Sequence, residues 1–192
     1  VTAANPAEPK GLSWGLESRL QFIDFRLRWE RHINRMDLTE HFGISVPQAS
    51  LDIAKYTELA PSNLTYDRSS KTYTAAPSFH PLYQRSSAQH YLAELLATKM
   101  GVIEPAASFI GSAPEADWAP SPWRTINEQT VEAVVQAIRQ QEAIWVSYQS
   151  MTSMDESVRL LSPHAIGNDG FCWHMRAFCH KRQRFSDFVL AR

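Results

Sequence analysis

The sequence predicts an α+β fold in which a helical N-terminal part precedes a strand-rich C-terminal part. Two helix-capping sequences separated by Gly43, with a Thr- and Tyr-rich hairpin after them, indicate the first part. Strand patterns after residue 143, two of them joined by the turn sequence Asn168-Asp169-Gly170, indicate the second. We expect four regions: a flexible arm over 1–12, a helical domain with a hairpin over 13–78, a helical linker over 79–142 and a strand domain over 143–192.

The composition is that of a folded protein with no overall charge bias. Hydrophobic residues make up 44% of the 192 residues and aromatic residues 11%, which is enough to build a core. Lys and Arg number 19 against 20 Asp and Glu, so total charge does not reveal a nucleic-acid partner. Every apolar run is shorter than the roughly 20 residues of a membrane span, and residues 1–10 lack a signal-peptide core. We therefore expect a cytoplasmic protein with no membrane partner.

Neither metal nor catalytic chemistry is indicated by the motifs. Cys172 and Cys179 are seven residues apart in a predicted strand, which places them on opposite faces, and neither belongs to a CxxC pair. Ser147, His164 and Asp169 could be imagined as a triad, but no nucleophile elbow, zinc motif or phosphate-binding loop accompanies them. We expect no catalytic residue, no metal ion and no cofactor, and therefore no enzyme.

The first predicted helix, near residues 16–29, carries more apolar surface than one core contact needs. The extra stripe either packs inside the domain or forms a subunit interface. The arginines on or after this helix either contact phosphate or pair with Asp24 and Glu30. The two stripes are Leu16, Leu20, Ile23, Leu27 and Phe22, Phe25, Trp29, and the arginines are Arg26, Arg28, Arg31 and Arg35.

Two capping sequences then predict a pair of short helices. Asp37-Leu38-Thr39-Glu40 predicts a helix that begins at Asp37 and stops at Gly43. Ser45-Val46-Pro47-Gln48 predicts a second helix that continues to about Leu59. A glycine turn and a small residue at the crossing point are typical of a helix-turn-helix. The predicted inner face of the second helix is Ala49, Ile53 and Tyr56.

Residues 64–74 alternate Thr and Tyr around a basic tip and so predict a β-hairpin. A hairpin directly after a helix-turn-helix is typical of a winged helix-turn-helix domain, whose second helix enters the DNA major groove. The residues that we expect to contact double-stranded DNA are Ser45, Gln48, Ser50, Lys55, Arg68 and Lys71.

These six residues have different expected roles. The amide of Gln48 can pair with both hydrogen-bonding atoms of an adenine edge, which makes it the best candidate for a base contact. Ser45 either caps its helix or reaches a phosphate. Lys55, Arg68 and Lys71 either face the DNA backbone, where charge sets affinity and salt dependence, or form an ordinary solvated surface.

The linker over 79–142 is expected to pack and to take part in dimerisation. Six of the eleven prolines lie within 75–124, around an amphipathic helix predicted at about 87–100. A further helix is predicted over 127–141, and strands over 143–150, 158–164, 171–180 and 184–192 follow it.

The C-terminal segment resembles the WYL domain, a small Sm-like β-barrel of bacterial regulators. The resemblance is carried by the strand Ile144-Trp145-Val146-Ser147-Tyr148, the corner Ser162-Pro163-His164, the Asp169-Gly170 turn, the strand Trp173-His174-Met175 and the segment from Phe185 to Arg192. His174 and Met175 stand where the namesake triplet has Tyr and Leu. Within the family, the sequence is similar to the repressors of BREX and CBASS phage-defence loci, which also carry an N-terminal winged helix-turn-helix.

The resemblance implies a site for an anionic ligand, a nucleotide or a nucleic-acid end. Aromatic faces and forked guanidinium donors suit such a ligand. Strand alternation separates Trp173 and Met175 from His174 and Arg176, and we favour the second pair as the polar face. A residue like Trp173 is more often part of the core than a ligand contact, and a lone histidine like His164 is more often structural. The implied ligand residues are Ser147, Tyr148, Trp173, His174, Arg176 and Arg192, with Arg159, His164 and Arg184 as weaker candidates.

Together these features predict a homodimeric transcriptional repressor of a phage-defence operon, acting at the bacterial nucleoid. Binding of the ligand would change the dimer and release operator DNA. The alternative is a non-catalytic nucleic-acid-binding accessory module of a defence system. Relatives of this architecture usually continue past the barrel into another small domain, so the sequence is expected to be either a truncated fragment or one from which the following residues have been left out.

Overall fold

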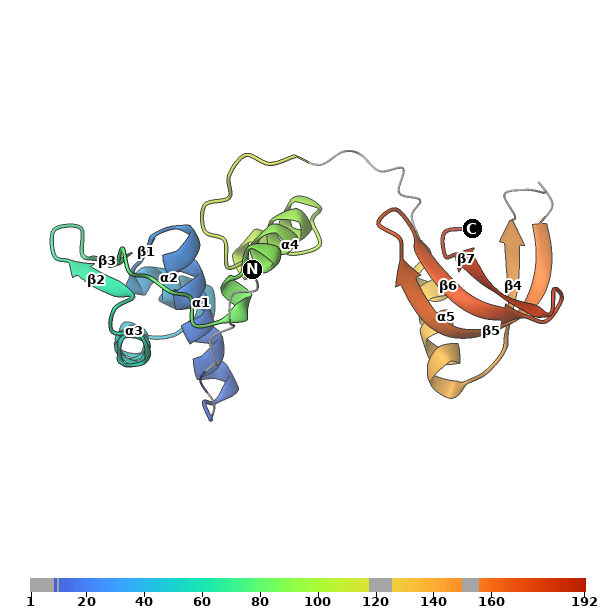
Figure 1. Cartoon of the computed structure of the whole chain (residues 1–192), viewed down its shortest axis with the longest axis horizontal. Helices are drawn as coiled ribbons and strands as arrows, with labels where there is room; N and C mark the ends of the chain where they lie inside the picture. The colour runs from blue at the N-terminus through green and yellow to red at the C-terminus, as the bar shows by residue number, and fades with distance from the viewer. Residues whose placement is uncertain (1–8, 10, 118–125, 150–155) are drawn as a thin grey trace. The chain divides into compact units, whose positions relative to one another are not determined.

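A computed structural model of the chain describes residues 9, 11–117, 126–149 and 156–192. The chain divides into two compact units, residues 1–118 and 119–192, which are treated separately below (Figure 1). The arm predicted over residues 1–12 lies for the most part outside the described residues.

Unit 1 is a small helical domain with a three-stranded antiparallel sheet. The strands lie in the order β1-β3-β2, and β2 and β3 form the hairpin predicted over residues 64–74. The elements are α1 (Trp14–Trp29), β1 (His32–Ile33), α2 (Arg35–Phe42), α3 (Val46–Leu59), β2 (Leu64–Asp67), β3 (Thr72–Ala75), the 3-10 turns η1 (Gln84–Ser86) and η2 (Pro105–Ala107), and α4 (Ala88–Lys99) between those turns.

Helix α2 begins earlier than the sequence predicted. Asn34 is its N-cap, and its side chain accepts hydrogen bonds from the backbone N–H groups of Met36 and Asp37 at 2.7 and 3.1 Å. Asp37 accepts the backbone N–H of Asn34 in return at 2.7 Å. The prediction that Asp37 starts the helix is therefore wrong, because Asp37 is the third residue of the helix and closes a capping box that Asn34 opens. The predicted end is confirmed: Gly43 has a φ of 65° at the C-cap.

Helix α3 follows the prediction closely. Ser45 is its N-cap and accepts the backbone N–H of Gln48, and Pro47 lies in the first turn. Ala49, Ile53 and Tyr56 are buried, which confirms the predicted inner face. Ala49 is fully buried, and its place at the crossing of α2 and α3 stays a prediction.

Both apolar stripes of α1 are covered inside unit 1. Phe22 packs edge-to-face against Phe109 with ring centroids 5.2 Å apart. Phe25 and Trp29 stack on Tyr91 of α4 at 5.9 and 4.3 Å. The second stripe therefore packs against the following part of the same chain and does not need a partner subunit.

Helix α4 confirms the amphipathic helix predicted at about 87–100, with Ser87 as its N-cap. Leu95 is buried in the core of unit 1. The opposite face leaves Leu92 61% and Leu96 46% exposed. The first half of the predicted linker is thus part of the N-terminal unit.

Unit 2 is an antiparallel sheet with one helix packed on it. Its strands lie in the order β4-β5-β6-β7, and Gly170, with a φ of 92°, lies in the turn between β5 and β6. The elements are α5 (Glu128–Gln140), β4 (Ile144–Gln149), β5 (Glu156–Asn168), β6 (Trp173–Cys179) and β7 (Arg184–Val189). The predicted α+β class is confirmed, and closure of the sheet into a barrel stays a prediction.

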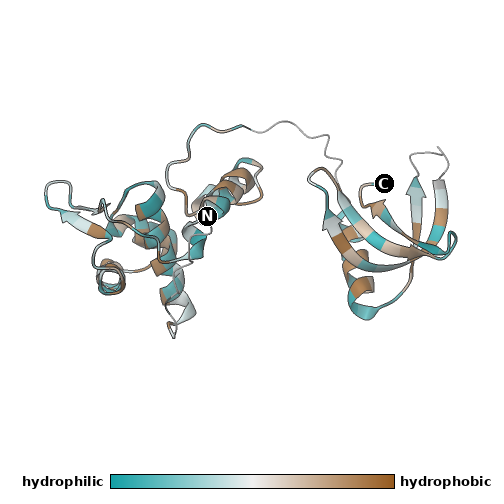
Figure 2. Cartoon of the chain, in the orientation of Figure 1, coloured by the Kyte–Doolittle hydropathy of each residue, from teal (hydrophilic) through white to brown (hydrophobic). Residues whose placement is uncertain are grey.

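Helix α5 covers one face of this sheet. Figure 2 shows the hydropathy changing from residue to residue along the strands, as expected when one face is buried. The register shifts between Pro163 and Ala165, so His164 occupies a bulge in β5. The buried residues of this unit's core are Val134, Leu161, Met175, Ala177, Cys179, Phe188 and Leu190.

The described residues also bear on the requirements of a disulfide, a metal site and a membrane-spanning helix. Cys172 and Cys179 are free thiols, and the residues that the structure describes contain no group of three or more His, Cys, Asp or Glu that could hold a metal ion. Within the same part of the chain, every helix is too short or too polar to span a bilayer.

Candidate nucleic-acid interface and ligand site

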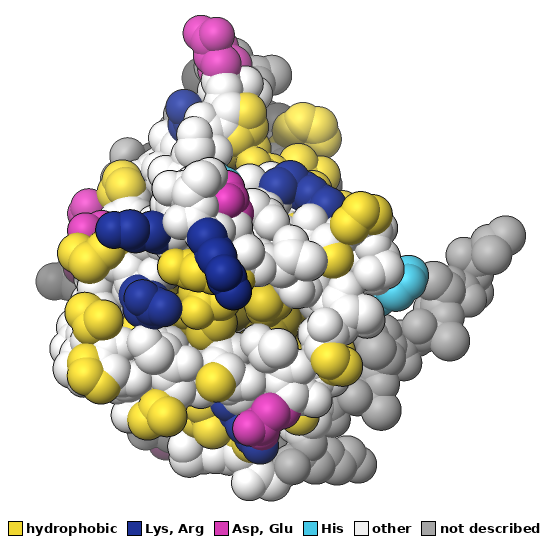
Figure 3. Space-filling model, turned by 90° about the vertical axis from the view of Figure 1, so that its left-hand side faces the viewer, with side chains coloured by type: hydrophobic (Ala, Val, Ile, Leu, Met, Phe, Trp, Pro, Cys, Tyr) yellow, Lys and Arg dark blue, Asp and Glu magenta, His cyan; other side chains and the backbone are white. Residues whose placement is uncertain are grey.

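Helix α3 and the β2–β3 hairpin lie at the same end of unit 1 (Figure 1). Arg68 and Lys71 are exposed in the turn of the hairpin. Asp67 closes this turn by accepting hydrogen bonds from the Ser69 backbone N–H and the Ser70 hydroxyl at 2.9 and 2.7 Å, and these bonds lower the pKa of Asp67. Figure 3 views this side and shows Lys and Arg side chains around hydrophobic ones. The turn therefore presents two cations on a well-defined support.

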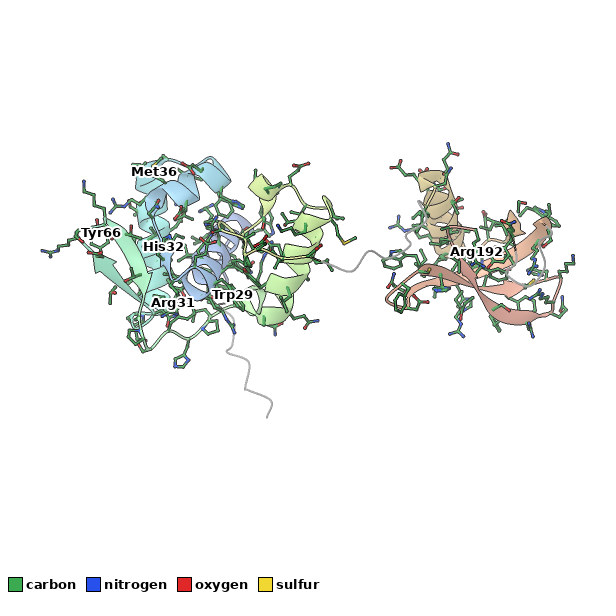
Figure 4. The ribbon with its side chains drawn as sticks, turned by 90° about the horizontal axis from the view of Figure 1, so that it is seen from above. Trp29, Arg31, His32, Met36, Tyr66 and Arg192 are labelled. Carbon is green, nitrogen blue, oxygen red and sulfur yellow. The ribbon has the colours of Figure 1, made fainter. Side chains whose placement is uncertain are left out.

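A second basic group lies at the base of the hairpin. The Arg35 guanidinium donates to the Tyr73 hydroxyl at 3.4 Å, and the Tyr73 ring lies 4.7 Å from that of Tyr66. Figure 4 shows Tyr66 on the hairpin, with His32 of β1 and Met36 of α2 also labelled. The sequence analysis mentioned Arg35 but missed these tyrosines, because only the fold brings the start of α2 to the hairpin.

Gln48, the predicted base contact, is held by a carboxylate of its own helix. Its side-chain amide donates to Asp52 at 2.9 Å. Asp52 is 1% exposed and also accepts two hydrogen bonds from the Arg19 guanidinium of α1, at 2.6 and 3.2 Å. One N–H of the amide and its carbonyl oxygen remain for an outside partner, which is the pair that an adenine edge requires. Asp52 thus fixes which way the amide of Gln48 faces.

Neither support of Gln48 was predicted from the sequence. The spacing of Gln48 and Asp52, four residues apart on a helix, is a signal that could have revealed their contact. Arg19 is 33 residues away from Asp52, so no local pattern could have indicated that ion pair.

The remaining predicted contacts of α3 also have partners within the chain. Ser45 caps the helix, in agreement with the structural alternative stated above. The Ser50 hydroxyl donates to the Val46 carbonyl at 3.0 Å. The Lys55 ammonium pairs with Glu58 at 2.8 Å, and both side chains are well exposed. An exposed pair of this kind contributes little to stability, so Lys55 can exchange Glu58 for a phosphate at small cost.

The arginines near α1 are mostly occupied inside unit 1. Arg26 pairs with Glu30 at 2.9 Å, and Arg28 lies over the Trp29 ring at 5.2 Å. Arg31 donates to the backbone carbonyls of Ala75 and Ala76 at the end of β3. The expectation that Asp24 pairs with these arginines is wrong. Asp24 points to the opposite side, into the core.

Asp24 joins α1 to α3 and to the segment around η1. It is completely buried and accepts hydrogen bonds from the Tyr56 hydroxyl at 2.6 Å, the Leu82 backbone N–H at 3.0 Å, the Tyr83 backbone N–H at 3.3 Å and the Ser86 hydroxyl. Burial raises the pKa of Asp24, although the four hydrogen bonds oppose that shift. This carboxylate therefore holds α3 in place against α1 and the segment around η1.

In unit 2 the strand register separates the predicted ligand residues onto two faces of the sheet. Tyr148 and Arg159 lie on the face toward α5, where the Arg159 guanidinium is 5.5 Å from the Tyr148 ring and donates to the Ser157 hydroxyl at 2.9 Å. Arg159 is 5% exposed. The Arg192 carbonyl accepts the Gln149 backbone N–H at 3.4 Å, so the end of the chain lies beside β4, and Figure 4 labels Arg192 there.

The opposite face carries a surface hollow of about 400 Å³ that includes His174 and Arg176. His174 contacts Asp169 at 2.8 Å and Arg176 pairs with Asp187 at 3.3 Å. Backbone hydrogen bonds from Cys172 and Phe171, with a further contribution from His174, lower the pKa of Asp169 to about 2. The hollow therefore holds both signs of charge. Its lining residues are Ala165, Ile166, Gly167, Asn168, Asp169, His174, Arg176 and Asp187.

The other ligand candidates lie apart from this hollow. Ser147 is exposed on β4, Trp173 is 45% exposed at the start of β6, and Arg184 is exposed at the start of β7. His164 packs edge-to-face with Phe185, ring centroids 5.2 Å apart. The sequence analysis did not anticipate the two carboxylates, Asp169 and Asp187, that accompany the favoured pair.

Two family models match the two units separately. The model described as the BrxR transcriptional regulator winged helix-turn-helix domain matches residues 15–97. The model described as the WYL domain matches residues 129–192.

Curated relatives match almost the whole chain. Proteins named DNA-binding transcriptional repressor CapW from Escherichia coli strain KTE188 and from Pseudomonas aeruginosa are each 46% identical over 183 residues, and one from Stenotrophomonas maltophilia is 46% identical over 179. The matches cover 93–95% of this chain and 60–61% of the relatives. The chain thus spans about three fifths of the length of these proteins.

Among solved structures, the proteasome accessory factor B/C of Arthrobacter aurescens aligns with 93% of this chain and 30% of its own, at 16% identity and a TM-score of 0.38. A likeness this low supports no inference. The chain therefore carries a winged helix-turn-helix domain of the BrxR type followed by a WYL domain, and over almost all of its length it is similar to proteins named DNA-binding transcriptional repressor CapW.

Proposed function

We propose that the protein is a sequence-specific DNA-binding transcriptional regulator, and specifically a repressor. The observation that carries this proposal is the joint placement of α3 and a basic hairpin at one end of unit 1. A helix that enters the major groove next to a wing that reaches phosphates is the arrangement by which winged helices bind duplex DNA. The name of the CapW relatives supports the same function. A regulator of this kind works without catalysis, at the nucleoid in the bacterial cytoplasm.

The salt dependence of binding tests the role of the hairpin. We expect the protein to select duplexes from a random DNA pool, and replacement of Arg68 or Lys71 by alanine to reduce the slope of log Kd against log salt concentration by about 1 each. Each replacement removes one cation that would displace a counterion from a phosphate. Fluorescence anisotropy of a labelled selected duplex at several salt concentrations measures the slope.

Arg182→Ala is the matched control, because Arg182 is an exposed arginine in a turn of unit 2. Its slope should equal that of the unaltered protein. Failure to retain any duplex would overturn the proposed function. The accessory-module alternative is favoured instead if duplex binding survives the joint change of Gln48→Ala and Lys55→Ala while Arg176→Ala abolishes binding of single strands.

We also propose that the repressor acts as a homodimer. Operators with two-fold symmetry need two DNA-binding units about one helical turn apart. The exposed apolar side chains of Leu92 and Leu96 on α4, and of Met100 directly after it, support a role for the predicted linker in dimerisation. The number of chains bound to each selected duplex is measured in the same titration by light scattering.

We propose that unit 2 senses a ligand and that this ligand, an anionic nucleotide or nucleic-acid end, binds in the hollow beside His174 and Arg176. The Arg176 guanidinium, the His174 imidazole, the volume of the hollow and its position in the WYL unit support this assignment. Asp187 competes for Arg176 and repels an anion. A ligand must therefore displace Asp187 from Arg176. The family resemblance separately supports a phage-defence operon as the target that the ligand signal controls.

Two opposite changes test this hollow. Arg176→Ala should weaken binding of a 5′-phosphorylated deoxytetranucleotide by tenfold or more, because a charge-assisted contact is lost. Asp187→Asn should strengthen it, because the competing negative charge is removed. Calorimetry on the full chain measures both, and Arg182→Ala should change neither. Weakening by Arg159→Ala and not by Arg176→Ala would contradict the assignment and move the site to the face toward α5.

A further inference from the structure

We propose that Leu51, on the outward face of α3, contacts the C5-methyl groups of thymine in the DNA major groove and thereby contributes to sequence specificity. The proposal rests on the proposed DNA-binding function and adds a residue that the motif analysis did not single out. It assigns an apolar contact to a helix for which polar contacts alone were expected.

The placement of Leu51 follows from the helical periodicity of α3. Ala49, Ile53 and Tyr56 face the core and are at most 1% exposed, whereas Leu51 is 64% exposed. Pro47 and Ala54, one turn before and about one turn after Leu51, are also exposed and extend the same face. A large apolar side chain in this position contributes nothing to the core of unit 1, so its surface is available to a partner.

The polar side chains of α3 are less available than Leu51. The amide of Gln48 donates to Asp52, the hydroxyl of Ser50 donates to the Val46 carbonyl, and the ammonium of Lys55 pairs with Glu58. The centre of the outward face is therefore apolar, with hydrogen-bonding groups at its margins. The apolar centre of this face of α3 would therefore contact an apolar group in the DNA major groove.

Thymine is the base that presents a methyl group in the major groove, and apolar side chains recognise it by contact. Duplex DNA is a better candidate for this face than an apolar protein surface, because the basic hairpin with Arg68 and Lys71 lies at the same end of the unit. Burial of one methyl group against Leu51 should change affinity roughly threefold to fivefold.

Removal of the methyl group alone tests the contact. A duplex selected from a random pool by the full chain is synthesised a second time with deoxyuridine in place of every thymidine, which preserves the base pairs and all hydrogen-bonding atoms. We expect the unaltered protein to bind the uridine duplex three to five times more weakly for each contacted methyl. Leu51→Ala should bind the thymidine duplex more weakly and show less than a 1.5-fold difference between the two duplexes. Anisotropy at one fixed salt concentration gives all four dissociation constants.

Val158→Ala is the matched control, because Val158 is an apolar residue of β5 in unit 2 that is 63% exposed and belongs to none of the proposed binding surfaces. This variant should keep the full difference between the two duplexes. The proposal is overturned if the unaltered protein binds both duplexes equally, or if Leu51→Ala keeps the same difference. Failure to select any duplex is a separate result, which overturns the proposed DNA-binding function and this contact with it.

Discussion

Replacing Asp24 with alanine should lower the free energy of unfolding of unit 1 by about 3–5 kcal/mol, the largest effect that we expect from a single change. Asp24 is fully buried and accepts four hydrogen bonds from Tyr56, Leu82, Tyr83 and Ser86. Each donor left without an acceptor in the core costs about 1–3 kcal/mol, and water in the space left by the carboxylate offsets part of the sum. Urea unfolding of the full chain, followed by circular dichroism of the helices, measures the loss.

A change of this size is a large part of the 5–15 kcal/mol that is typical of a folded domain. Glu40→Ala, which removes an exposed carboxylate from α2, is the control and should change stability by less than about 0.5 kcal/mol. A loss below about 1 kcal/mol for Asp24→Ala would show that the network does not hold α3 in place.

The effect of Asp24 should also depend on pH in a direction that its burial determines. Burial raises the pKa of Asp24 above its usual value near 4. Because the pKa is raised in the folded state, the contribution of Asp24 to the free energy of unfolding is complete below about pH 4. This contribution decreases as the pH rises through the folded-state pKa. The difference in stability between the unaltered chain and Asp24→Ala should therefore be widest at low pH.

Asp52→Ala should both destabilise unit 1 and impair DNA discrimination. The carboxylate is 1% exposed and bridges Arg19 of α1 to Gln48. Loss of one partner of a buried ion pair costs about 3–5 kcal/mol, but the Arg19 side chain is 18% exposed and can turn toward water. We therefore expect a loss of about 2 kcal/mol. Without Asp52 the amide of Gln48 also rotates freely, so the selected duplex loses the part of its advantage over a scrambled one that the Gln48 contact provides.

Gln48→Ala separates these two effects. It removes the proposed base contact, worth about 1–3 kcal/mol of discrimination, and leaves the Arg19–Asp52 pair intact, so stability should stay close to that of the unaltered chain. Adding Asp52→Ala to Gln48→Ala should lower stability but cause no further loss of discrimination. If Asp52→Ala leaves discrimination unchanged, Asp52 does not position Gln48. Urea unfolding and competition anisotropy measure the two quantities.

Local patterns predicted much of the fold. The N-caps of α3, α4 and α5, the left-handed glycine that ends α2 and the hairpin between β2 and β3 depend on neighbours within a few residues, and short-range hydrogen bonds of this kind leave a clear sequence pattern. The same logic failed at the start of α2, where Asn34 and Asp37 both have capping side chains and the pattern favoured the wrong one.

The candidate sites depend more on contacts between distant residues. Sequence patterns alone located α3, the basic hairpin and the strands that carry His174 and Arg176, because periodicity and alternation determine which side chains share a face. Only the tertiary structure decided that Asp24 bonds Tyr56, that Arg19 supports Asp52, and that Asp169 and Asp187 accompany the favoured ligand residues. The physical reason is that a buried polar group must find a partner wherever packing provides one. For Asp24 and Asp52 those partners come from other helices, 32 or more residues away.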